Sequence, residues 1–305
     1  MPISNIKVTI NGTTTTLTDN GNGTYSATLA APNRTSYNVN SGHYYPVTVV
    51  ATNMAGTATT VNDTHSTLGS KLRLFVKEVT APTIAISAPT SNQYLANATP
   101  TMTFTLTDES NGSGIAITTL SFKVDSTTYT NTSPGVTVSS VTNGYKVTFT
   151  PQTALKDGNH TLTVNVKDND GNSATSASVS FTTDTVAPTL SVTNPSANGT
   201  YTAESALNVT GTVGDSTSGV PTVKITLNGS DVGAVTVSNG SFSKGITLAN
   251  GNNTIVVTAT DLAGKVTTIT RTITLDTSSP VIASVSITPN PVNVGANYTV
   301  TITVE

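Results

Sequence analysis

The feature that most constrains the fold of this chain is a repeated pair of alternating segments. Residues 254–280 read TIVVTATDLAGKVTTITRTITLDTSSP, in which apolar and polar residues alternate on both sides of a short turn. Residues 161–188 repeat this pattern, and residues 45–61 repeat its central part with Asn53 in the place of Asp261. Period-two alternation about a turn that contains glycine is typical of an antiparallel hairpin with one buried face. The repetition therefore predicts an array of β-modules.

The composition supports an all-β class and excludes several functions. Only 10% of the residues are charged and 35% are hydrophobic, and threonine, serine, asparagine and glycine make up much of the rest. Threonine suits a half-exposed strand, whereas glycine and asparagine suit tight turns. The net charge is −3, which leaves no basic surface for nucleic acid. The chain has no cysteine, so it has neither disulfides nor a thiolate site.

Prolines mark the boundaries between the repeats. Pro82, Pro188 and Pro280 follow the ends of successive alternating segments and are 106 and 92 residues apart. Both spacings suit a sandwich of about seven strands, which needs roughly 100 residues. The sequence therefore predicts four parts, at residues 1–79, 80–185, 186–278 and 279–305.

The two terminal parts depart from the repeat. Residues 1–79 are shorter than the others and contain a segment, residues 62–70, without parallel in the later repeats, so we expect this part to be a cap or a docking end. Residues 279–305 have the pattern of only two strands, and an isolated hairpin is marginally stable in water. Three explanations stay open: the hairpin packs on the preceding domain, it completes a sheet of another subunit, or the chain was cut there.

Several local motifs carry a resemblance to a known family. They are an Asp-x-x-x-Pro entry at 184–188, a Ser-Gly loop at 215–219, a Lys-Asp-Gly-Asn-His turn at 156–160 and a closing hairpin at 258–265. This set resembles bacterial immunoglobulin-like (Big-type) domains and extends over about residues 80–278. The resemblance implies a tandem array of immunoglobulin-like antiparallel β-sandwiches, but it implies little about function, because such domains serve many roles.

The N-terminus adds an expectation about location. Residues 1–17 have no basic region followed by an apolar stretch, and no run approaches 18 apolar residues. We therefore expect neither a cleaved signal nor membrane insertion. In this respect the chain resembles the accessory Ig-like structural proteins of tailed phages, which implies synthesis in the cytoplasm and assembly on a virion surface.

Motifs of catalysis are not found in the sequence. His43, His65 and His160 lie in separate segments without metal-ligand spacing, and we predict that all three are solvated. No Gly-x-Ser-x-Gly nucleophile motif is present. The prediction is a protein that is not an enzyme and that has no cofactor apart from a possible calcium ion.

Calcium is suggested by carboxylates that the sandwich topology collects at one end of each repeat. In the second repeat these are Asp108, Glu109, Asp168 and Asp170, with Glu78 arriving on the linker. In the third repeat the corresponding set is Asp184, Asp215 and Asp261. Carboxylate oxygens are the ligands that calcium prefers, and an ion at each junction would stiffen the array. The alternative is that these side chains only cap local turns.

Tyrosines suggest a second kind of site. Tyr37, Tyr44 and Tyr45 are concentrated in the first part, and tyrosine is favoured in recognition surfaces. The alternative is that they fill the core, because the chain has no tryptophan.

These features together predict a non-enzymatic structural or adhesive protein. We expect an extended array that decorates a phage tail or capsid and contacts other virion proteins, copies of itself or host-surface glycans. The alternative is a carbohydrate-binding or spacer region of a secreted bacterial cell-surface protein or cell-wall enzyme.

Overall fold

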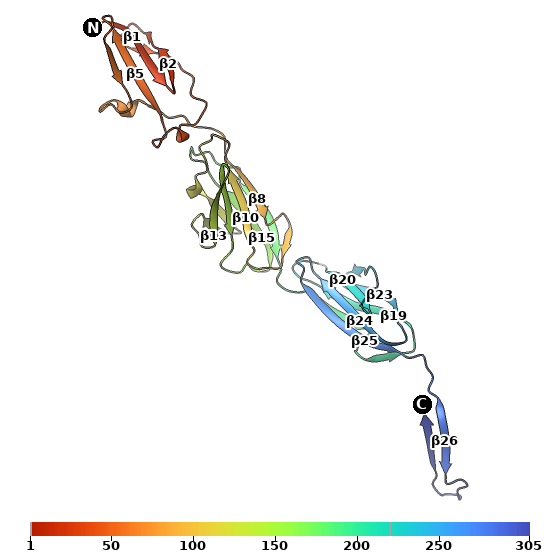
Figure 1. Cartoon of the computed structure of the whole chain (residues 1–305). Coiled ribbons are helices and arrows are strands. Elements are labelled where there is room, and N and C mark those ends of the chain that lie inside the picture. The colour runs from red at the N-terminus through yellow and green to blue at the C-terminus, as the bar shows by residue number, and fades with distance from the viewer. Residues whose placement is uncertain (1, 220) are drawn as a thin grey trace. The chain divides into compact units, whose positions relative to one another are not determined.

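The computed structural model describes residues 2–219 and 221–305 and divides the chain into two compact units, Met1–Asp184 and Thr185–Glu305. The regular secondary structure of the described part consists almost entirely of β-strands (Figure 1). Among the described residues, none of the helices has the length and apolar character needed to span a bilayer. We call residues 2–79 the N-terminal module, 80–184 the second module, 185–278 the third module and 279–305 the C-terminal hairpin.

The N-terminal module has one main sheet. The sheet has the order β2-β1-β5-β6, with β7 pairing to β5, and β3 and β4 form a separate ribbon. Its elements are β1 (Ile3–Ile10), β2 (Thr13–Thr16), β3 (Thr18–Asp19), β4 (Tyr25–Ser26), η1 (Ser36–Asn38), β5 (Tyr45–Asn53), β6 (Ala58–Val61), η2 (Gly69–Lys71) and β7 (Arg73–Leu74).

The second module is a sandwich of two sheets, with the orders β13-β14-β10-β8 and β12-β11-β15-β16-β9. The ring centroid of Phe122 lies 5.4 Å from that of Phe104 and 5.2 Å from that of Phe149, and all three side chains are fully buried between the sheets. The elements are β8 (Thr83–Ala88), β9 (Gln93–Leu95), β10 (Met102–Thr107), η3 (Ile117–Thr119), β11 (Ser121–Val124), β12 (Thr127–Thr130), β13 (Val136–Val141), β14 (Gly144–Phe149), β15 (Gly158–Asn165) and β16 (Ala177–Thr183).

The third module repeats this architecture with the orders β17-β19-β23-β22 and β18-β25-β24-β20-β21. Its core is aliphatic, and Ile225, Ile255 and Val257 are fully buried. The elements are β17 (Thr189–Asn194), β18 (Thr200–Thr202), β19 (Ala206–Gly214), β20 (Thr222–Leu227), β21 (Ser230–Asp231), β22 (Val237–Ser238), β23 (Ser241–Thr247), β24 (Gly251–Thr260) and β25 (Val266–Leu275).

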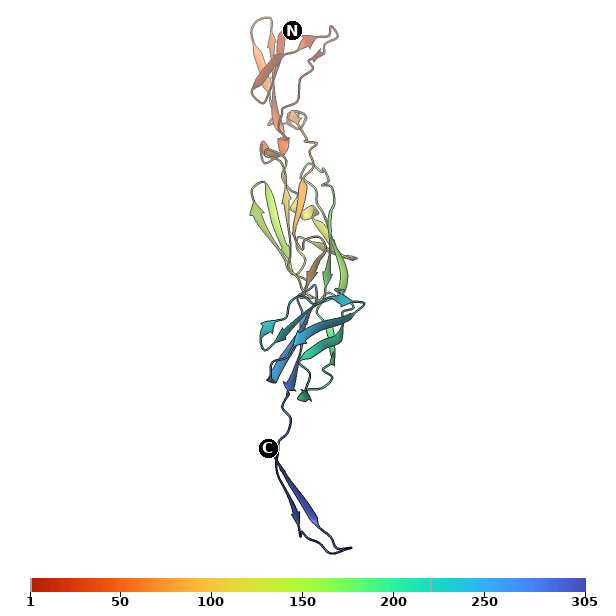
Figure 2. The same cartoon turned by 90° about the vertical axis from the view of Figure 1, so that its right-hand side faces the viewer.

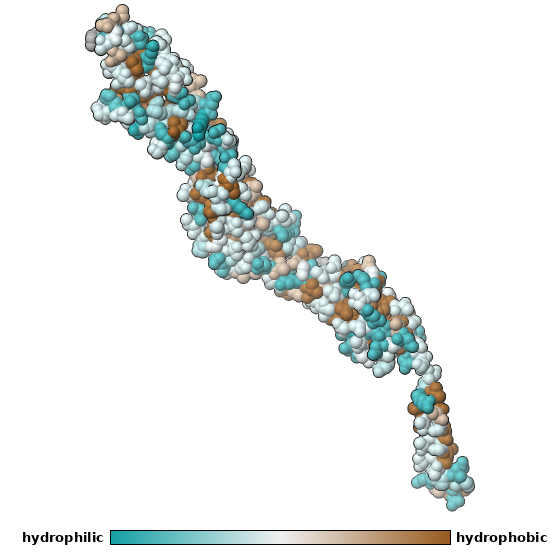
Figure 3. Space-filling model, in the orientation of Figure 1, coloured by the Kyte–Doolittle hydropathy of each residue, from teal (hydrophilic) through white to brown (hydrophobic). Residues whose placement is uncertain are grey.

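The C-terminal hairpin consists of β26 (Ile282–Thr288) and β27 (Thr299–Val304), which lie side by side in both views (Figures 1 and 2). All side chains from residue 276 to residue 305 are exposed. Of the three explanations for this hairpin, packing on the preceding domain finds no support in these exposed side chains, and the other two stay open. Its two faces differ sharply, because isoleucines and valines line one face and serines and threonines line the other (Figure 3).

Candidate metal centre

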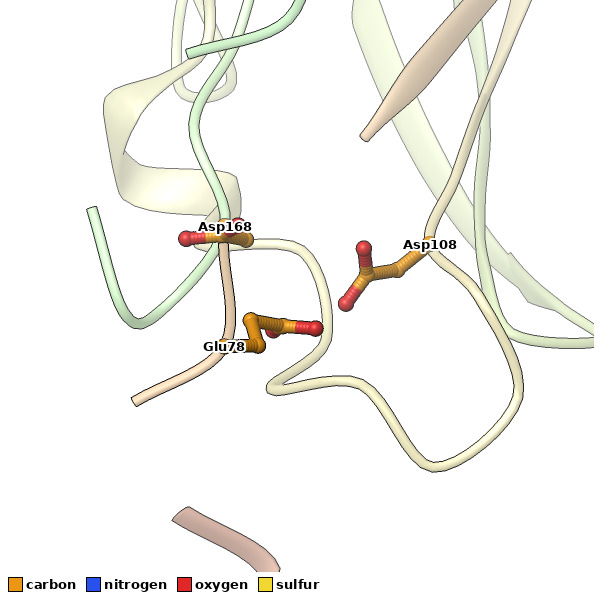
Figure 4. Close-up of side chains that lie close together, drawn as sticks. All are labelled: Glu78, Asp108 and Asp168. Carbon is orange, nitrogen blue, oxygen red and sulfur yellow. The ribbon is translucent and has the colours of Figure 1, made fainter. Parts of the chain in front are cut away.

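Three carboxylates from separate segments of the first unit converge on one point. Glu78 precedes β8, Asp108 directly follows β10, and Asp168 lies in the turn after β15. One carboxylate oxygen of each lies within 4.8 Å of those of the other two. Figure 4 shows the carboxyl groups of Glu78 and Asp108 directed toward each other, with Asp168 beside them.

Backbone amides and one amide side chain fix the orientation of these carboxylates. The Gly114 N–H donates to Asp108 Oδ2 at 2.6 Å, and the Ser113 N–H donates to Glu78 Oε1. The Asn172 N–H and its side-chain Nδ2 each donate to Asp168, both at 2.8 Å. Hydrogen bonds from two segments, Ser113–Gly114 and Asn172, therefore hold the three carboxylates in place.

Two oxygens of these carboxylates are buried without a hydrogen-bond donor. These are Glu78 Oε2 and Asp108 Oδ1, and Asp108 and Asp168 are only 7% and 2% exposed. A buried carboxylate oxygen without a partner is costly, and neighbouring negative charges add to that cost. A cation bound by the three carboxylates would offset both costs.

Two carboxyl groups at this end of the module, those of Asp108 and Glu109, have raised pKa values. Burial, as the largest cause, raises the pKa of Asp108 above its ordinary value, and the nearby Glu78 and Asp168 charges add to the increase. Burial and a hydrogen bond to Glu78 raise the pKa of Glu109 to about 7. In the absence of a cation, this end of the module therefore binds protons more readily than ordinary carboxylates do.

The donor set fits calcium. Calcium takes six to eight oxygen ligands with flexible geometry, and three carboxylates can supply up to six of them. Gly112 allows the close approach, because a Cβ at this position would lie 2.6 Å from Asp108 Oδ2 and 2.9 Å from Glu78 Oε2. Binding of calcium itself stays a prediction.

Asp170 does not join the three carboxylates but anchors the linker beside them. Its Oδ2 accepts hydrogen bonds from the Glu78 N–H, at 3.1 Å, and from the Thr35 hydroxyl of the N-terminal module. Asn172 Nδ2 donates to the Glu78 backbone carbonyl at 3.2 Å. The segment that carries Glu78 is thus held on both sides.

In the second unit, two carboxylates occupy the equivalent positions. Asp261 Oδ1 accepts from the Lys265 N–H at 2.8 Å, whereas its Oδ2 is buried without a donor. Asp215 Oδ1 accepts from the Thr217 and Ser218 N–H groups, so this side chain also caps its own turn, as the alternative predicted. Asp184 belongs to the first unit, and the prediction that it shares a site with Asp215 and Asp261 stays a prediction.

The three tyrosines have different environments. Tyr45 is 3% exposed and its hydroxyl donates to the Arg34 carbonyl, so it is a core residue and is unavailable for surface recognition. Tyr37 stacks on His43 with ring centroids 3.9 Å apart. Tyr44 lies under the Arg73 guanidinium at 4.6 Å and donates from its hydroxyl to Asp63. These two tyrosines remain candidates for a recognition surface.

The prediction that His160 is solvated is wrong. Its side chain is buried, with Nδ1 at 2.8 Å from Asp125 Oδ2 and Nε2 at 2.9 Å from Thr183 Oγ1. The order Asp, His and hydroxyl resembles a catalytic triad, but Thr183 is 0% exposed, which leaves a substrate no access. His160 instead ties β15 to the Lys156 carbonyl at 2.7 Å. A signal was available, because His160 alternates with the core residues Leu162 and Val164.

The third module contains a neutral version of the same arrangement. Asn253 takes the place of His160 and donates to the Ala249 carbonyl at 2.7 Å. Asn228 takes the place of Asp125, and its Oδ1 accepts from the Thr254 N–H at 2.8 Å. The repetition shows that the buried polar group has a structural role in both modules.

Comparisons with known proteins agree with this architecture. Residues 87–185 match the bacterial Ig-like domain. The second and third modules are immunoglobulin-like β-sandwiches that follow each other in the chain. Residues 188–277 also match domain B of glucodextranase.

More distant similarities are limited to parts of other proteins. The chain is 36% identical to bacillopeptidase F of Bacillus subtilis (strain 168) over 163 residues, which is 50% of this chain and only 11% of that protein. Among solved structures, the fibronectin(III)-like modules of CbhA from Clostridium thermocellum are 18% identical, with a TM-score of 0.40, and the match covers 63% of this chain and 94% of theirs. A tetra-tandem repeat from the extending region of a large adhesion protein is 20% identical, with a TM-score of 0.34, over 98% of this chain and 79% of that one.

Proposed function

We propose that this chain is a non-enzymatic structural array that acts as a spacer or adhesive region of a bacterial extracellular protein, with calcium bound at the junction before the second module. The observation that carries the proposal is the pair of buried carboxylate oxygens without donors, Glu78 Oε2 and Asp108 Oδ1. A bound cation would hold the linker segment against the end of the sandwich. Stiffening of a linker is useful to a spacer, because it restricts the angle between neighbouring modules.

The extracellular setting is supported by the matches to bacillopeptidase F and glucodextranase domain B. Both similarities cover modules rather than whole proteins, and they are consistent with a region that supports another activity or surface. The finer expectation of a phage virion rests on the resemblance of the sequence alone and stays a prediction. Host-surface glycans are the proposed ligand class for an adhesive role, with Tyr37, Tyr44 and the 61%-exposed Phe75 as the aromatic contacts.

The test is the effect of calcium on the full chain with and without Asp108→Asn. We expect calcium to raise the melting temperature of the first unit, chelator to lower it, and the variant to abolish this response. Asp157→Asn, at an exposed aspartate of the same module, is the matched control and should keep the response. Isothermal titration calorimetry on the same proteins should give one fewer binding event for Asp108→Asn. A parent chain that neither binds calcium nor changes its melting temperature would refute the calcium junction.

A further inference from the structure

The segment that contains β7 presents cations on one side. Residues 71–77 read KLRLFVK, and exposed residues alternate with half-buried ones throughout this run. The aliphatic residues are the half-buried ones, and the exposed residues are Lys71, Arg73, Phe75 and Lys77. Such alternation is typical of an extended segment with one side turned to solvent. We call these four exposed residues the cationic row, and they include three of the 13 Lys and Arg residues of the chain.

The protein does not neutralise the charges of the cationic row. Within the described part of the chain, the ion pairs are those of His160 and Lys224, and none involves Lys71, Arg73 or Lys77. Lys77 Nζ donates a hydrogen bond of 3.4 Å to a backbone carbonyl. Among the residues that the structure describes, none offers a hydrogen-bond acceptor to the side chain of Lys71 or of Arg73. The row therefore carries cationic donors that are free to take an anion.

Arg73 is positioned by an aromatic ring rather than by a carboxylate. Its Cζ lies 4.6 Å from the centroid of the Tyr44 ring, which is a cation–π contact. The ring itself is fixed, because the Tyr44 hydroxyl donates to Asp63 Oδ2 at 2.8 Å. Glycine at position 42 lets the ring lie here, since a Cβ at Gly42 would be 2.4 Å from Tyr44 Cε1. Contact with a neutral ring leaves the full charge of Arg73 in place.

An exposed aromatic ring lies beside this arginine. The centroid of the Phe75 ring is 6.1 Å from that of Tyr44, the two rings are tilted by 60°, and the Phe75 side chain is 61% exposed. One face of a sugar ring consists of C–H groups, which are removed from water when they pack on an aromatic ring. A planar guanidinium matches the two oxygens of a carboxylate. Phe75 and Arg73 together therefore fit a sugar ring that carries a carboxylate.

Other anions fit this surface less well. Nucleic acid needs a broad basic surface to neutralise many phosphates, whereas this chain has a net charge of −3 and only a short row of cations here. An acidic peptide supplies carboxylates but no ring with a C–H face to pack on Phe75. A uronic acid has both features in one residue. The pairing of ring and charge on the protein thus favours an acidic sugar.

We infer that Arg73, Phe75 and Tyr44 form a binding site for an acidic polysaccharide. The carboxylate of a uronic acid binds the Arg73 guanidinium, and the ring of the same sugar packs on Phe75. Lys71, on the same side of the segment, provides charge for the carboxylate of a neighbouring sugar. The inference rests on the adhesive role in the proposed function and narrows its ligand class from glycans to charged glycans. It does not depend on calcium.

The test compares two forms of one ligand by NMR titration of the full chain, which also detects millimolar binding. The probes are an oligogalacturonide and the same oligomer with its carboxylates converted to methyl esters. Chelator is present throughout, so calcium cannot bridge ligand and protein. The ester should bind about 10- to 100-fold more weakly than the acid, since it loses hydrogen bonds between charged groups. Arg73→Gln should bind the acid about as weakly as the parent chain binds the ester.

Two further variants separate the ring from the charge. Phe75→Ala should weaken the binding of both the acid and the ester, because it removes the surface under the sugar. Its melting temperature should match that of the parent chain, since the Phe75 side chain is exposed. Lys123→Gln removes one exposed cation from the second module and is the matched control for Arg73→Gln. This control should bind the acid as tightly as the parent chain does.

Three results would overturn the inference. Equal binding of the acid and the ester would do so, although a neutral glycan would then remain a ligand for the proposed adhesive role. Equally tight binding of polyglutamate would show that charge alone is recognised and that the sugar ring is not. Failure of both oligomers to bind would remove this site, whereas the calcium junction would still be judged by its own melting experiment.

Discussion

Two equivalent valines allow the coverage of the two sheet faces to be measured. Val257 and Val49 occupy the same register position in the third and N-terminal modules, but Val257 is fully buried and Val49 only half-buried. Replacement of either by alanine removes two methyl groups, worth about 0.8 kcal/mol each when buried. A cavity adds about 1 kcal/mol where the surroundings are closely packed. We therefore expect Val257→Ala to cost about 2–3 kcal/mol and Val49→Ala about 1 kcal/mol.

The assay must report each module separately, because a chain of several modules does not unfold in one step. Native-state hydrogen exchange followed by mass spectrometry meets this need, with peptides from β24 and β5 as the reporters. An equal loss of protection in the two variants would show that the face of the N-terminal sheet is as well covered as that of the third module, and would refute the reasoning.

Two further predictions concern polar side chains of the second module. The pKa of Glu109 is raised to about 7 from an ordinary 4.5. Between these two pH values the native state therefore binds more protons than the unfolded state. In the presence of chelator, the free energy of unfolding of the first unit should thus fall as the pH rises from 4.5 to 7. Thermal unfolding across that range tests this, and Glu109→Gln should flatten the dependence; a rise in stability would contradict it. His160→Asn should destabilise the second module less than His160→Leu, because asparagine is the residue at the equivalent position of the third module, Asn253. Leucine would leave the Lys156 carbonyl with one hydrogen-bond donor fewer. We expect this loss to lower the free energy of unfolding by about 1–3 kcal/mol. Hydrogen exchange of β15 measures the difference, and equal effects of the two variants would argue against the hydrogen-bonding role.

Much of the architecture was predictable because strand patterns and turns are local properties of the sequence. The alternation in residues 254–275 predicted the long hairpin of β24 and β25. The topology of the sandwich then predicted that Asp108 and Asp168 lie at one end, and the structure brings them together with Glu78. The same reasoning failed for Asp170, whose side chain turns to the linker, because the direction of a turn residue depends on its neighbours in space.

Burial of polar residues was the least predictable property. His160 and Tyr45 both have polar groups that suggested exposure, yet each is buried with its polar atoms satisfied by hydrogen bonds. The partners come from residues distant in sequence or from irregular loops, so a local pattern contains little information about them. The alternation of His160 with Leu162 was the one signal that pointed inward.

The sequence by itself determined the class of the fold, the repetition of modules and the chemistry available at their ends. These follow from the periodicity of apolar residues, from the glycine and asparagine turns and from the carboxylates near the prolines, all of which act over a few residues. Only the tertiary structure decided which faces are covered, because coverage depends on sheets formed by strands far apart in the chain. It also decided that Glu78 and Asp108 keep oxygens without donors, since 30 residues separate them in sequence and the fold places them face to face.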